Sequence, residues 1–328
     1  MDHLGKPYTN QVYIAAELPT ITTEILKAHQ LDYKVYAGEG LISHQELMAQ
    51  VEDAKYLITA LSTQVDKEII DHAPNLKLIA NFGAGFNNID TSYAKGKGIV
   101  VTNTPIVSTN PVAEVTIGLI LALSHRMVEG DAQMRKDGFP GWAPLYFLGH
   151  EIAGKTLGIV GLGNIGQEVA RKAAALSMKV QYWQPHQKSD PEERSLGVKY
   201  VTFDELIETS DFISINAPQT SANYHQFNQN VFQQMKATAA LVNVGRGPIV
   251  DEAALRDALK NKDIAGAALD VYEHEPAVTP GLQDMKNVIL TPHIGNATVE
   301  ARDAMGKIVA DNIGLISDGK KAKYVVNQ

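Results

Sequence analysis

Short apolar runs alternate with amphipathic segments along almost the whole chain. Eleven of these runs have the length of a β-strand: 12–18, 33–38, 55–61, 76–83, 98–103, 156–161, 179–183, 211–218, 239–245, 265–272 and 287–293. Between them, segments such as 21–29 and 251–261 place apolar residues at helical spacing. Strands that alternate with helices in this way form βαβ units, and the pattern therefore predicts parallel sheets with helices on both faces.

This number of strands exceeds that of a usual open sheet, so we expect two α/β domains. Two long helical segments, 110–136 and 296–319, lie next to the change from one half of the pattern to the other. We expect them to connect the domains, with the second one returning to the first domain. The expected domains are then a discontinuous one, 1–103 with 296–328, and a continuous one, 104–295.

Composition narrows the class of protein further. The 328 residues are 45% hydrophobic and 20% charged, as in soluble globular proteins. A net charge of −8 argues against a large surface for nucleic acid or anionic membrane. The chain contains no cysteine, which excludes disulfides and thiolate catalysis, and its N-terminus has no signal-peptide pattern. We expect a cytoplasmic protein that binds neither nucleic acid nor membrane.

The strongest local motif is "GLGNIG" at 161–166, which matches G-x-G-x-x-G between an apolar strand and a helix. In such a turn, Gly161 permits the tight bend, Gly163 lets the backbone approach a pyrophosphate, and Gly166 lets helix and strand pack closely. The helix N-terminus supplies free N–H groups for the phosphates. The motif in this context predicts a dinucleotide-binding site.

The end of the next strand bears on the type of dinucleotide. An acidic residue usually stands there and binds the adenosine ribose of NAD, but this chain has the neutral Gln184, followed by His186 and Lys188. A 2′-phosphate would meet no carboxylate, which favours NADP(H). In the alternative interpretation, Gln184 binds the ribose hydroxyls of NAD(H), and His186 and Lys188 are solvated surface residues.

Polar residues also follow three later strands, at the sheet edge where doubly wound folds bind ligands. They are Arg246, Asp270 with Glu275, and His293. A guanidinium suits a carboxylate ligand, and a carboxylate beside an imidazole favours its protonated form, which can donate a proton at neutral pH. Each residue alone has an ordinary structural alternative, such as a loop salt bridge or a turn cap. The hypothesis that these residues are catalytic depends on all of them lying at the same edge of the sheet as the glycine-rich turn.

Five motifs make the chain similar to the D-isomer-specific 2-hydroxyacid dehydrogenases over nearly its whole length. They occupy 82–90, 101–114, 154–166, 243–276 and 290–298. The resemblance implies a Rossmann cofactor domain inserted into a flavodoxin-like substrate domain, and a homodimer. The segment 137–152, rich in Gly, Pro and aromatic residues, would be an ordered arm or loop, with Trp142 and Tyr146 in dimer contact, in a neighbouring active site or in simple packing.

The resemblance also assigns residue roles. Arg246, Glu275 and His293 would form the catalytic set, without a metal ion. The substrate would contact Arg246, His293, the backbone of Ala84 and Gly85, and a pocket wall that includes Leu61 and Ser62. Asp270 would contact the nicotinamide. The full expected cofactor set is Thr104, Gly161, Gly163, Asn164, Ile165, Gly166, Gln184, His186, Lys188, Ala217, Pro218, Val244, Gly245, Asp270 and Gly295.

The activity implied is reduction of a 2-oxo acid to a D-2-hydroxy acid by hydride transfer from NAD(P)H, with His293 as proton donor. Phenylpyruvate or another bulky 2-oxo acid, glyoxylate and hydroxypyruvate are the candidate substrates. Glu275 argues against a formate dehydrogenase, in which Gln stands at this position. A protein of the same fold that senses the nucleotide as a corepressor is the alternative from another functional class.

Overall fold

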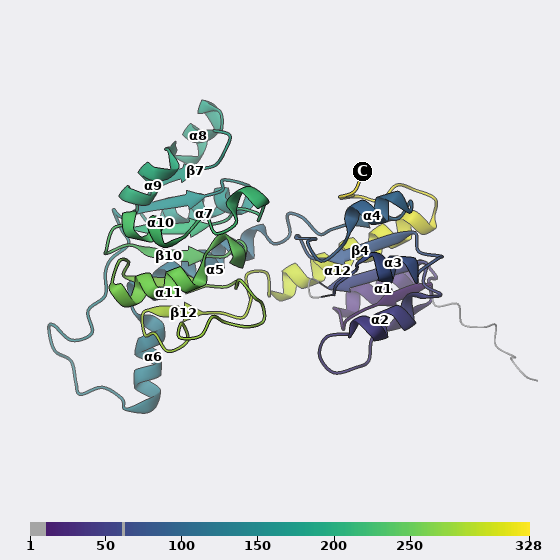
Figure 1. The fold of residues 1–328 in the computed structure, drawn as a ribbon, viewed down its shortest axis with the longest axis horizontal. Helices are drawn as coiled ribbons and strands as arrows, with labels where there is room; N and C mark the ends of the chain where they lie inside the picture. Colours follow the sequence, from purple (N-terminus) through teal and green to yellow (C-terminus); the bar gives the residue numbers. More distant parts are fainter. Residues whose placement is uncertain (1–10, 61–62) are drawn as a thin grey trace, which may run out of the picture. The chain divides into compact units, whose positions relative to one another are not determined.

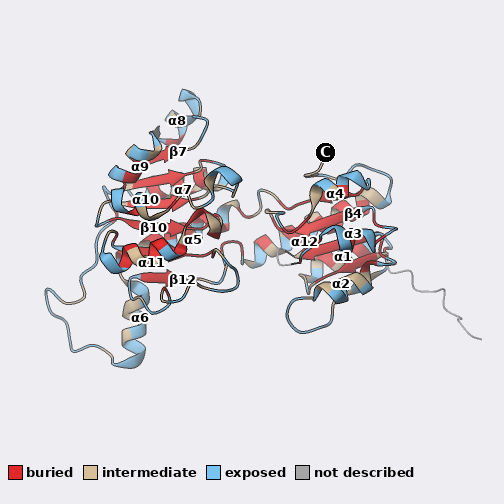
Figure 2. Cartoon of the chain, viewed as in Figure 1, coloured by how far each residue is buried: buried red, intermediate tan, exposed pale blue. Residues whose placement is uncertain are grey.

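The structure is a computed structural model that describes residues 11–60 and 63–328. The chain forms two compact units, Met1–Ser108 with Thr298–Gln328, and Thr109–Ala297 (Figure 1). The expected boundaries lie a few residues away from these. In both units, the strands lie in the buried interior of the unit (Figure 2).

The first unit is built on a five-stranded parallel sheet of order β2-β1-β3-β4-β5. This is the flavodoxin-like order. The strands are β1 Val12–Ile14, β2 Tyr33–Val35, β3 Tyr56–Ala60, β4 Leu78–Phe82 and β5 Val100–Thr102. The helices are α1 Thr20–Ala28, α2 His44–Val51, α3 Lys67–Asp71, α4 Thr91–Gly96 and α12 Val299–Ser317.

Side chains alternate across this sheet. Ile58 and Leu78 belong to a cluster with Met305 and Ile313 of α12, whereas Leu57 and Ile79 belong to a second cluster with α2 and α3. Both faces are therefore covered, as expected for parallel strands with near-continuous apolar sequence.

The second unit is built on a seven-stranded parallel sheet of order β12-β11-β10-β9-β6-β7-β8. Counted from β6, this is the Rossmann order with one further strand, and it reverses direction between β6 and β9. The strands are β6 Thr156–Val160, β7 Lys179–Trp183, β8 Val198–Tyr200, β9 Phe212–Ile215, β10 Ala240–Asn243, β11 Gly266–Leu269 and β12 Val288–Leu290. The helices are α5 Thr109–Ser124, α6 Met127–Lys136, α7 Asn164–Ala175, α8 Asp190–Leu196, α9 Phe203–Thr209, α10 Gln229–Gln234 and α11 Glu252–Asn261.

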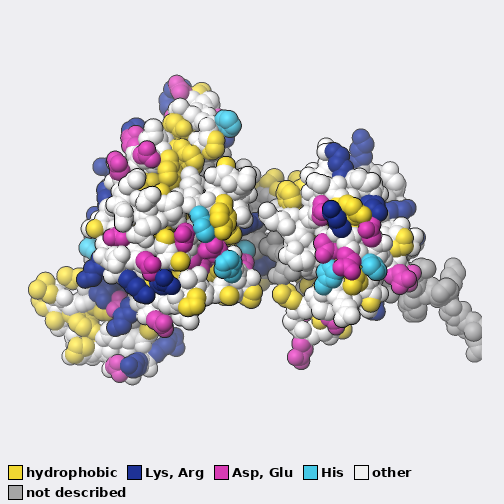
Figure 3. Space-filling view, in the orientation of Figure 1, with side chains coloured by type: hydrophobic (Ala, Val, Ile, Leu, Met, Phe, Trp, Pro, Cys, Tyr) yellow, Lys and Arg dark blue, Asp and Glu magenta, His cyan; other side chains and the backbone are white. Residues whose placement is uncertain are grey.

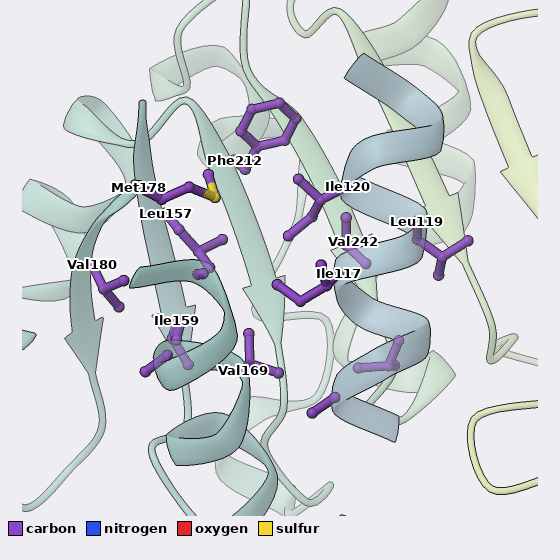
Figure 4. Close-up of a cluster of buried hydrophobic side chains, with 14 of the residues drawn as sticks. Ile117, Leu119, Ile120, Leu157, Ile159, Val169, Met178, Val180, Phe212 and Val242 are labelled. Atoms are coloured by element: carbon purple, nitrogen blue, oxygen red, sulfur yellow. The ribbon is translucent and has the colours of Figure 1, made fainter. Parts of the chain in front are cut away.

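One face of this sheet packs on α5 and α7. Ile117 and Ile120 of α5 and Val169 of α7 lie over Leu157 and Val242 of the strands (Figure 4). The two sheets confirm the expected class of two parallel-sheet α/β units. Strand β8 was not predicted, because its three residues include only one with a fully apolar side chain, Val198.

The expected helical segment 110–136 is two helices rather than one. Helices α5 and α6 meet at a bend of 63°, and Arg126 between them has a left-handed φ of 54°. The bend follows from contacts with a distant part of the chain: His150 N–H donates to the carbonyl of Ser124, and the Arg126 guanidinium stacks on Phe147 at 4.0 Å. In the described chain no single helix is long and apolar enough to cross a membrane. The two helices of this bent pair, counted together, do reach that length and apolar content.

Candidate functional site

The glycine-rich turn lies between β6 and α7, at the carboxyl edge of the second unit's sheet. Gly161 has φ of +94°, which L-residues rarely adopt. A Cβ on Gly166 would lie 2.2 Å from the carbonyl oxygen of Gly161, whereas one on Gly163 would meet nothing within 4 Å. Asn164 and Ile165 open the helix, and its N-cap Gly163 provides no side-chain cap. The open backbone and uncapped N–H groups fit the pyrophosphate of a dinucleotide.

Gln184 lies directly on this turn. Its Oε1 accepts a hydrogen bond from the Leu162 N–H at 3.0 Å, and its Nε2 donates to the His186 carbonyl at 2.7 Å. Of the two candidate donors beyond it, the His186 side chain is exposed, and Lys188 is paired with Glu192 at 3.3 Å. The edge of the cofactor site therefore carries a neutral amide where an acidic side chain usually stands.

The turn after β9 packs closely against the glycine-rich turn, and the turn after β10 packs against the turn after β9. A Cβ on Gly161 would lie 3.0 Å from Ala217, and one on Gly245 would lie 2.9 Å from the Ala217 carbonyl. Pro218 and Val244 are the chain neighbours of these two residues. Ala217 thus lies next to the glycine-rich turn, and the other three predicted cofactor residues lie in the two turns that follow β9 and β10, near the point where the strand order reverses and such sheets bind ligands.

His293 and Glu275 form a direct pair in the second unit. The His293 Nδ1 lies 3.1 Å from Glu275 Oε2, and the Glu275 Oε1 accepts from the Tyr272 N–H at 3.1 Å. Burial opposes ionisation of Glu275, but the hydrogen bond and charge of His293, the Tyr272 N–H and the charge of Arg246 outweigh it, so the pKa of Glu275 is lowered from its usual value. The carboxylate is thus ionised and orients the imidazole.

Arg246 follows β10 and begins the short turn Gly247–Ile249. Its Nη1 donates to the Gly245 carbonyl at 2.7 Å, and it forms no ion pair with any residue that the structure describes. Burial lowers the pKa of Arg246 and the Glu275 charge raises it, with burial the larger effect. A half-buried guanidinium with unused N–H groups suits a carboxylate ligand.

Asp270 is buried and bonds to the loop that carries His293. Its Oδ1 accepts from Thr291 Oγ1 at 2.7 Å and the Ile294 N–H at 2.8 Å, and its Oδ2 accepts from the Gly295 N–H at 2.8 Å. His293 itself has a left-handed φ of 53°, a conformation that surrounding contacts must hold. The structure therefore shows Asp270 as the anchor of this loop, while its expected contact with nicotinamide stays a prediction.

In the first unit, the predicted carboxylate loop is held by buried asparagines. Asn81 Nδ2 donates to the Gly85 carbonyl at 2.6 Å, and Asn103 Nδ2 donates to the Ala84 carbonyl at 2.7 Å. The N–H groups of Ala84 and Gly85 have no partner among the described residues. A loop whose carbonyls are occupied and whose N–H groups are free can bind an anion.

Of the other predicted residues of the first unit, the structure describes Thr104 but not Leu61 and Ser62. Thr104 is fully buried, its N–H donates to the Gly83 carbonyl, and its hydroxyl has no partner within the described chain. Leu61 and Ser62 lie outside the described residues. The sequence analysis missed Asn81, Asn103 and the Tyr272 N–H, because hydrogen bonds to main-chain atoms leave no spacing signal in a sequence.

A cavity in the second unit lies away from these residues. A cavity of about 420 Å³ is lined by residues at the amino ends of strands, such as Phe212, Ala240 and Gly266, and by Leu123 and Leu148. None of the predicted catalytic or cofactor residues lines it. In the part of the chain that the structure describes, no group of three or more His, Asp or Glu side chains is arranged to hold a metal ion.

Comparison with known proteins decides the family. A sequence model of the D-isomer specific 2-hydroxyacid dehydrogenase NAD-binding domain matches residues 117–295, more than half of the chain. The chain belongs to this family. The match covers the glycine-rich turn, Gln184, the Arg246 turn, Glu275 and His293, so this part is a NAD-type nucleotide-binding domain and the protein is an oxidoreductase.

Whole-chain relatives agree with this assignment. A Staphylococcus haemolyticus protein named as a 2-hydroxyacid dehydrogenase is 52% identical over 318 residues, 97% of this chain and 99% of the relative. A Thermus thermophilus structure is 34% identical with a TM-score of 0.91, covering 96% of this chain and 99% of its own. The NADPH-dependent glyoxylate/hydroxypyruvate reductase of Sinorhizobium meliloti, solved with NADP and malonate, is 31% identical with a TM-score of 0.81, covering 97% of each chain. Because the Staphylococcus haemolyticus and Sinorhizobium meliloti relatives are named as a dehydrogenase and a reductase, the comparison favours an enzyme over a nucleotide-sensing corepressor.

Proposed function

We propose that this dehydrogenase reduces a 2-oxo acid to a D-2-hydroxy acid with NADPH. The observation that carries the proposal is the position of the His293–Glu275 pair and of the Arg246 guanidinium, which forms no ion pair with any described residue. Both follow strands of the same parallel sheet as the glycine-rich turn, and therefore lie at its carboxyl edge. A proton donor, a carboxylate receptor and a dinucleotide turn are the parts that such a reduction needs.

The residues have separate tasks. Arg246 binds the substrate carboxylate and polarises the keto oxygen, and the N–H groups of Ala84 and Gly85 are the proposed anion-binding group of the first unit. Because Nδ1 of His293 is engaged by Glu275, its Nε2 is the atom that donates a proton to the developing alkoxide. Glu275 orients the imidazole through its contact with Nδ1. The bound nicotinamide supplies the hydride to the carbonyl carbon.

We assign the cofactor as NADPH rather than NADH because of the neutral edge at Gln184. A carboxylate there would repel a 2′-phosphate, whereas His186 and Lys188 offer it donors. The Sinorhizobium meliloti relative is NADPH-dependent and was solved with NADP. The backbone of the glycine-rich turn and the predicted residues of the second unit, among them Asp270 and Gly295, would hold the rest of the dinucleotide, and Thr104 is the proposed cofactor contact of the first unit.

The substrate is a small 2-oxo acid. Glyoxylate and hydroxypyruvate are the first candidates because the Sinorhizobium meliloti relative is named for them. Phenylpyruvate tests whether the site accepts a bulky side chain.

We also propose that the protein is a homodimer. Helix α6 and the loop after it expose many large apolar side chains, which gather on one surface (Figure 3, lower left). The exposed side chains are Met127, Val128, Met134, Phe139, Trp142, Leu145 and Leu148. Trp142 is 85% exposed, and a contiguous apolar surface of this kind marks a protein–protein contact. Sedimentation of wild type and of a Trp142→Ser, Leu145→Ser variant tests this proposal.

A spectrophotometric assay tests the proposed reaction. Oxidation of NADPH and of NADH is followed with glyoxylate, hydroxypyruvate, pyruvate and phenylpyruvate. We expect turnover with at least one acid and a higher kcat/KM with NADPH. Binding of the cofactor without oxidation by any acid would overturn the proposed reaction and favour a nucleotide sensor. Equal or better use of NADH would overturn the cofactor assignment alone.

A further inference from the structure

The Arg246 turn is held between two other segments of the second unit. From one segment, the His225 N–H donates to the Pro248 carbonyl at 2.9 Å, and the Phe227 N–H donates to the Ile249 carbonyl at 3.0 Å. Against the other segment, a Cβ on Gly247 would lie 1.9 Å from the carbonyl carbon of Tyr272. The turn therefore has backbone contacts to both neighbours and no room for a side chain at Gly247.

A hydrogen bond between a histidine and a glutamate joins the two flanking segments directly. The His225 Nε2 lies 2.6 Å from Glu273 Oε1, and the two side chains are 29% and 11% exposed. His225 has a left-handed φ of 49°, and its ring stacks on Tyr224 at 4.0 Å. A non-glycine residue in this conformation needs contacts to hold it, and the bond to Glu273 is one of them.

Glu273 is anchored at the start of helix α11. Its N–H donates to the Glu252 carboxylate at 2.7 Å, and its Oε2 accepts from the Glu252 N–H at 3.4 Å. Glu252 is 1% exposed and also accepts from Thr279 Oγ1 at 2.6 Å. A helix N-terminus favours a carboxylate. Glu273 is therefore held in place by α11, and its carboxylate holds the His225 ring in turn.

The same short segment also fixes the catalytic carboxylate. The Tyr272 N–H donates to Glu275 Oε1, and Glu275 Oε2 bonds to His293. Residues 272–275 therefore contact the Arg246 turn through their backbone and the imidazole of His293 through Glu275. Any shift of this segment relative to segment 225–227 would change where the guanidinium lies with respect to the His293–Glu275 pair.

We propose that His225 and Glu273 are positioning residues of the reaction. Their contact clamps the Arg246 turn against the segment that carries Glu275, and it sets the guanidinium and the imidazole at the separation that one 2-oxo acid requires. In this proposal, neither side chain contacts the substrate or the cofactor. The inference rests on the proposed function, because it requires Arg246 to bind the substrate carboxylate.

The test uses the full-length enzyme with His225→Gln, Glu273→Gln and the double variant. We expect kcat/KM for the 2-oxo acid to fall about 10- to 100-fold in each single variant, as for a misplaced binding group. The loss should lie mainly in KM for the acid, with the dissociation constant of NADPH, measured by fluorescence, within about twofold of wild type. The double variant should lose no more than the worse single variant, because both remove one interaction.

Two further variants separate positioning from general packing. His225→Lys keeps a hydrogen-bond donor that can reach Glu273, and we expect it to recover most of the lost kcat/KM. His274→Gln is the matched control, because His274 lies 3.9 Å from the same carboxylate but is 77% exposed; it should leave kcat and KM unchanged. Should Glu273→Gln fail to fold, the His225 variants still decide the question.

The outcomes also distinguish the two proposals. Unchanged kcat and KM in His225→Gln, with a lower melting temperature, would reduce the pair to a stabilising contact and overturn the positioning role. Additive losses in the double variant would overturn it as well. Arg246→Gln is measured in parallel: full activity of that variant would overturn the proposed function itself, whereas its inactivity together with normal His225 variants would overturn the positioning role alone.

Discussion

The Oε1 of Gln184 accepts a hydrogen bond from the Leu162 N–H at 3.0 Å, so the residue that follows β7 is bonded to the glycine-rich turn itself. The side chain is thereby held beside the cofactor site in a single orientation. Its amide brings no charge to this position. We therefore expect the charge at residue 184 to control whether a 2′-phosphate is accepted there.

Gln184→Glu should shift the cofactor preference toward NADH. Glu has the same length and keeps an acceptor for Leu162, but its negative charge repels a 2′-phosphate. We expect the ratio of kcat/KM for NADPH to that for NADH to fall at least about tenfold, equivalent to about 1.4 kcal/mol. Gln184→Asp should shift the ratio in the same direction. Gln234→Glu adds the same charge at an exposed position of α10 and should leave the ratio unchanged; a constant ratio in both Gln184 variants would refute the NADPH assignment.

Two glycines of the same turn should respond differently to alanine. In Gly166→Ala, the Cβ meets the Gly161 carbonyl at 2.2 Å, and we expect a loss of about 1–3 kcal/mol in the free energy of unfolding, as for overpacked sites. In Gly163→Ala, the Cβ meets nothing within 4 Å, so the cost should stay below about 1 kcal/mol. Dinucleotide affinity should nevertheless fall in Gly163→Ala, because the methyl group lies where the pyrophosphate approaches. Denaturant unfolding and fluorescence titration measure the two effects, and full affinity in Gly163→Ala would remove this glycine from the phosphate site.

Local signals predicted the parts of the molecule that depend on neighbouring residues. The turn between β6 and α7 was predicted because an apolar strand, three spaced glycines and an amphipathic helix follow one another within a short stretch. The fold class followed from the regular alternation of strands and helices. The residues of the His293–Glu275 pair were found because each follows a strand of the same parallel sheet.

Contacts between distant residues were not predictable in the same way. The bend at Arg126 depends on residues 147–150, which return to the end of α5. The bonds from Asp270 to residues 291–295 and from Asn103 to Ala84 likewise join separate segments. Such bonds form only once the chain is packed, and the sequence around the residues that they join has no spacing or periodicity that would reveal them.

Asn103→Ala should weaken substrate binding through the loop that it supports. The variant leaves the Ala84 carbonyl without its 2.7 Å donor, which we expect to cost about 1–3 kcal/mol of stability. Release of the loop should raise KM for the 2-oxo acid on the order of tenfold, with a smaller change in kcat. Asn87→Ala, at an exposed position of the same loop, is the control. Equal KM values in Asn103→Ala and Asn87→Ala would argue against anion binding by this loop.

His293→Gln should abolish proton donation while leaving the nucleotide site intact. Glutamine cannot supply a proton at neutral pH, and loss of a positioned general acid typically lowers turnover by about 10²- to 10⁴-fold. NADPH affinity should not change, because the glycine-rich turn does not contact His293 through any bond that the structure describes. Steady-state kinetics and a fluorescence titration measure the two quantities. Turnover within about threefold of wild type would exclude His293 as the proton donor.

Glu275→Gln should change the pH dependence of the protein's folding stability. The folded-state pKa of Glu275 lies below its usual value of 4.5, so the folded protein binds this proton more weakly than the unfolded chain does. The resulting stabilisation is fully present above the unfolded pKa and is lost as the pH falls through the folded pKa. Glutamine does not titrate and lacks this contribution. Melting temperatures of wild type and Glu275→Gln, measured from about pH 6 to about pH 3, should therefore differ most at the upper end and converge as the pH falls. A difference that stays constant over this interval would show that the carboxylate is not held in its ionised form by the contacts with His293 and Tyr272.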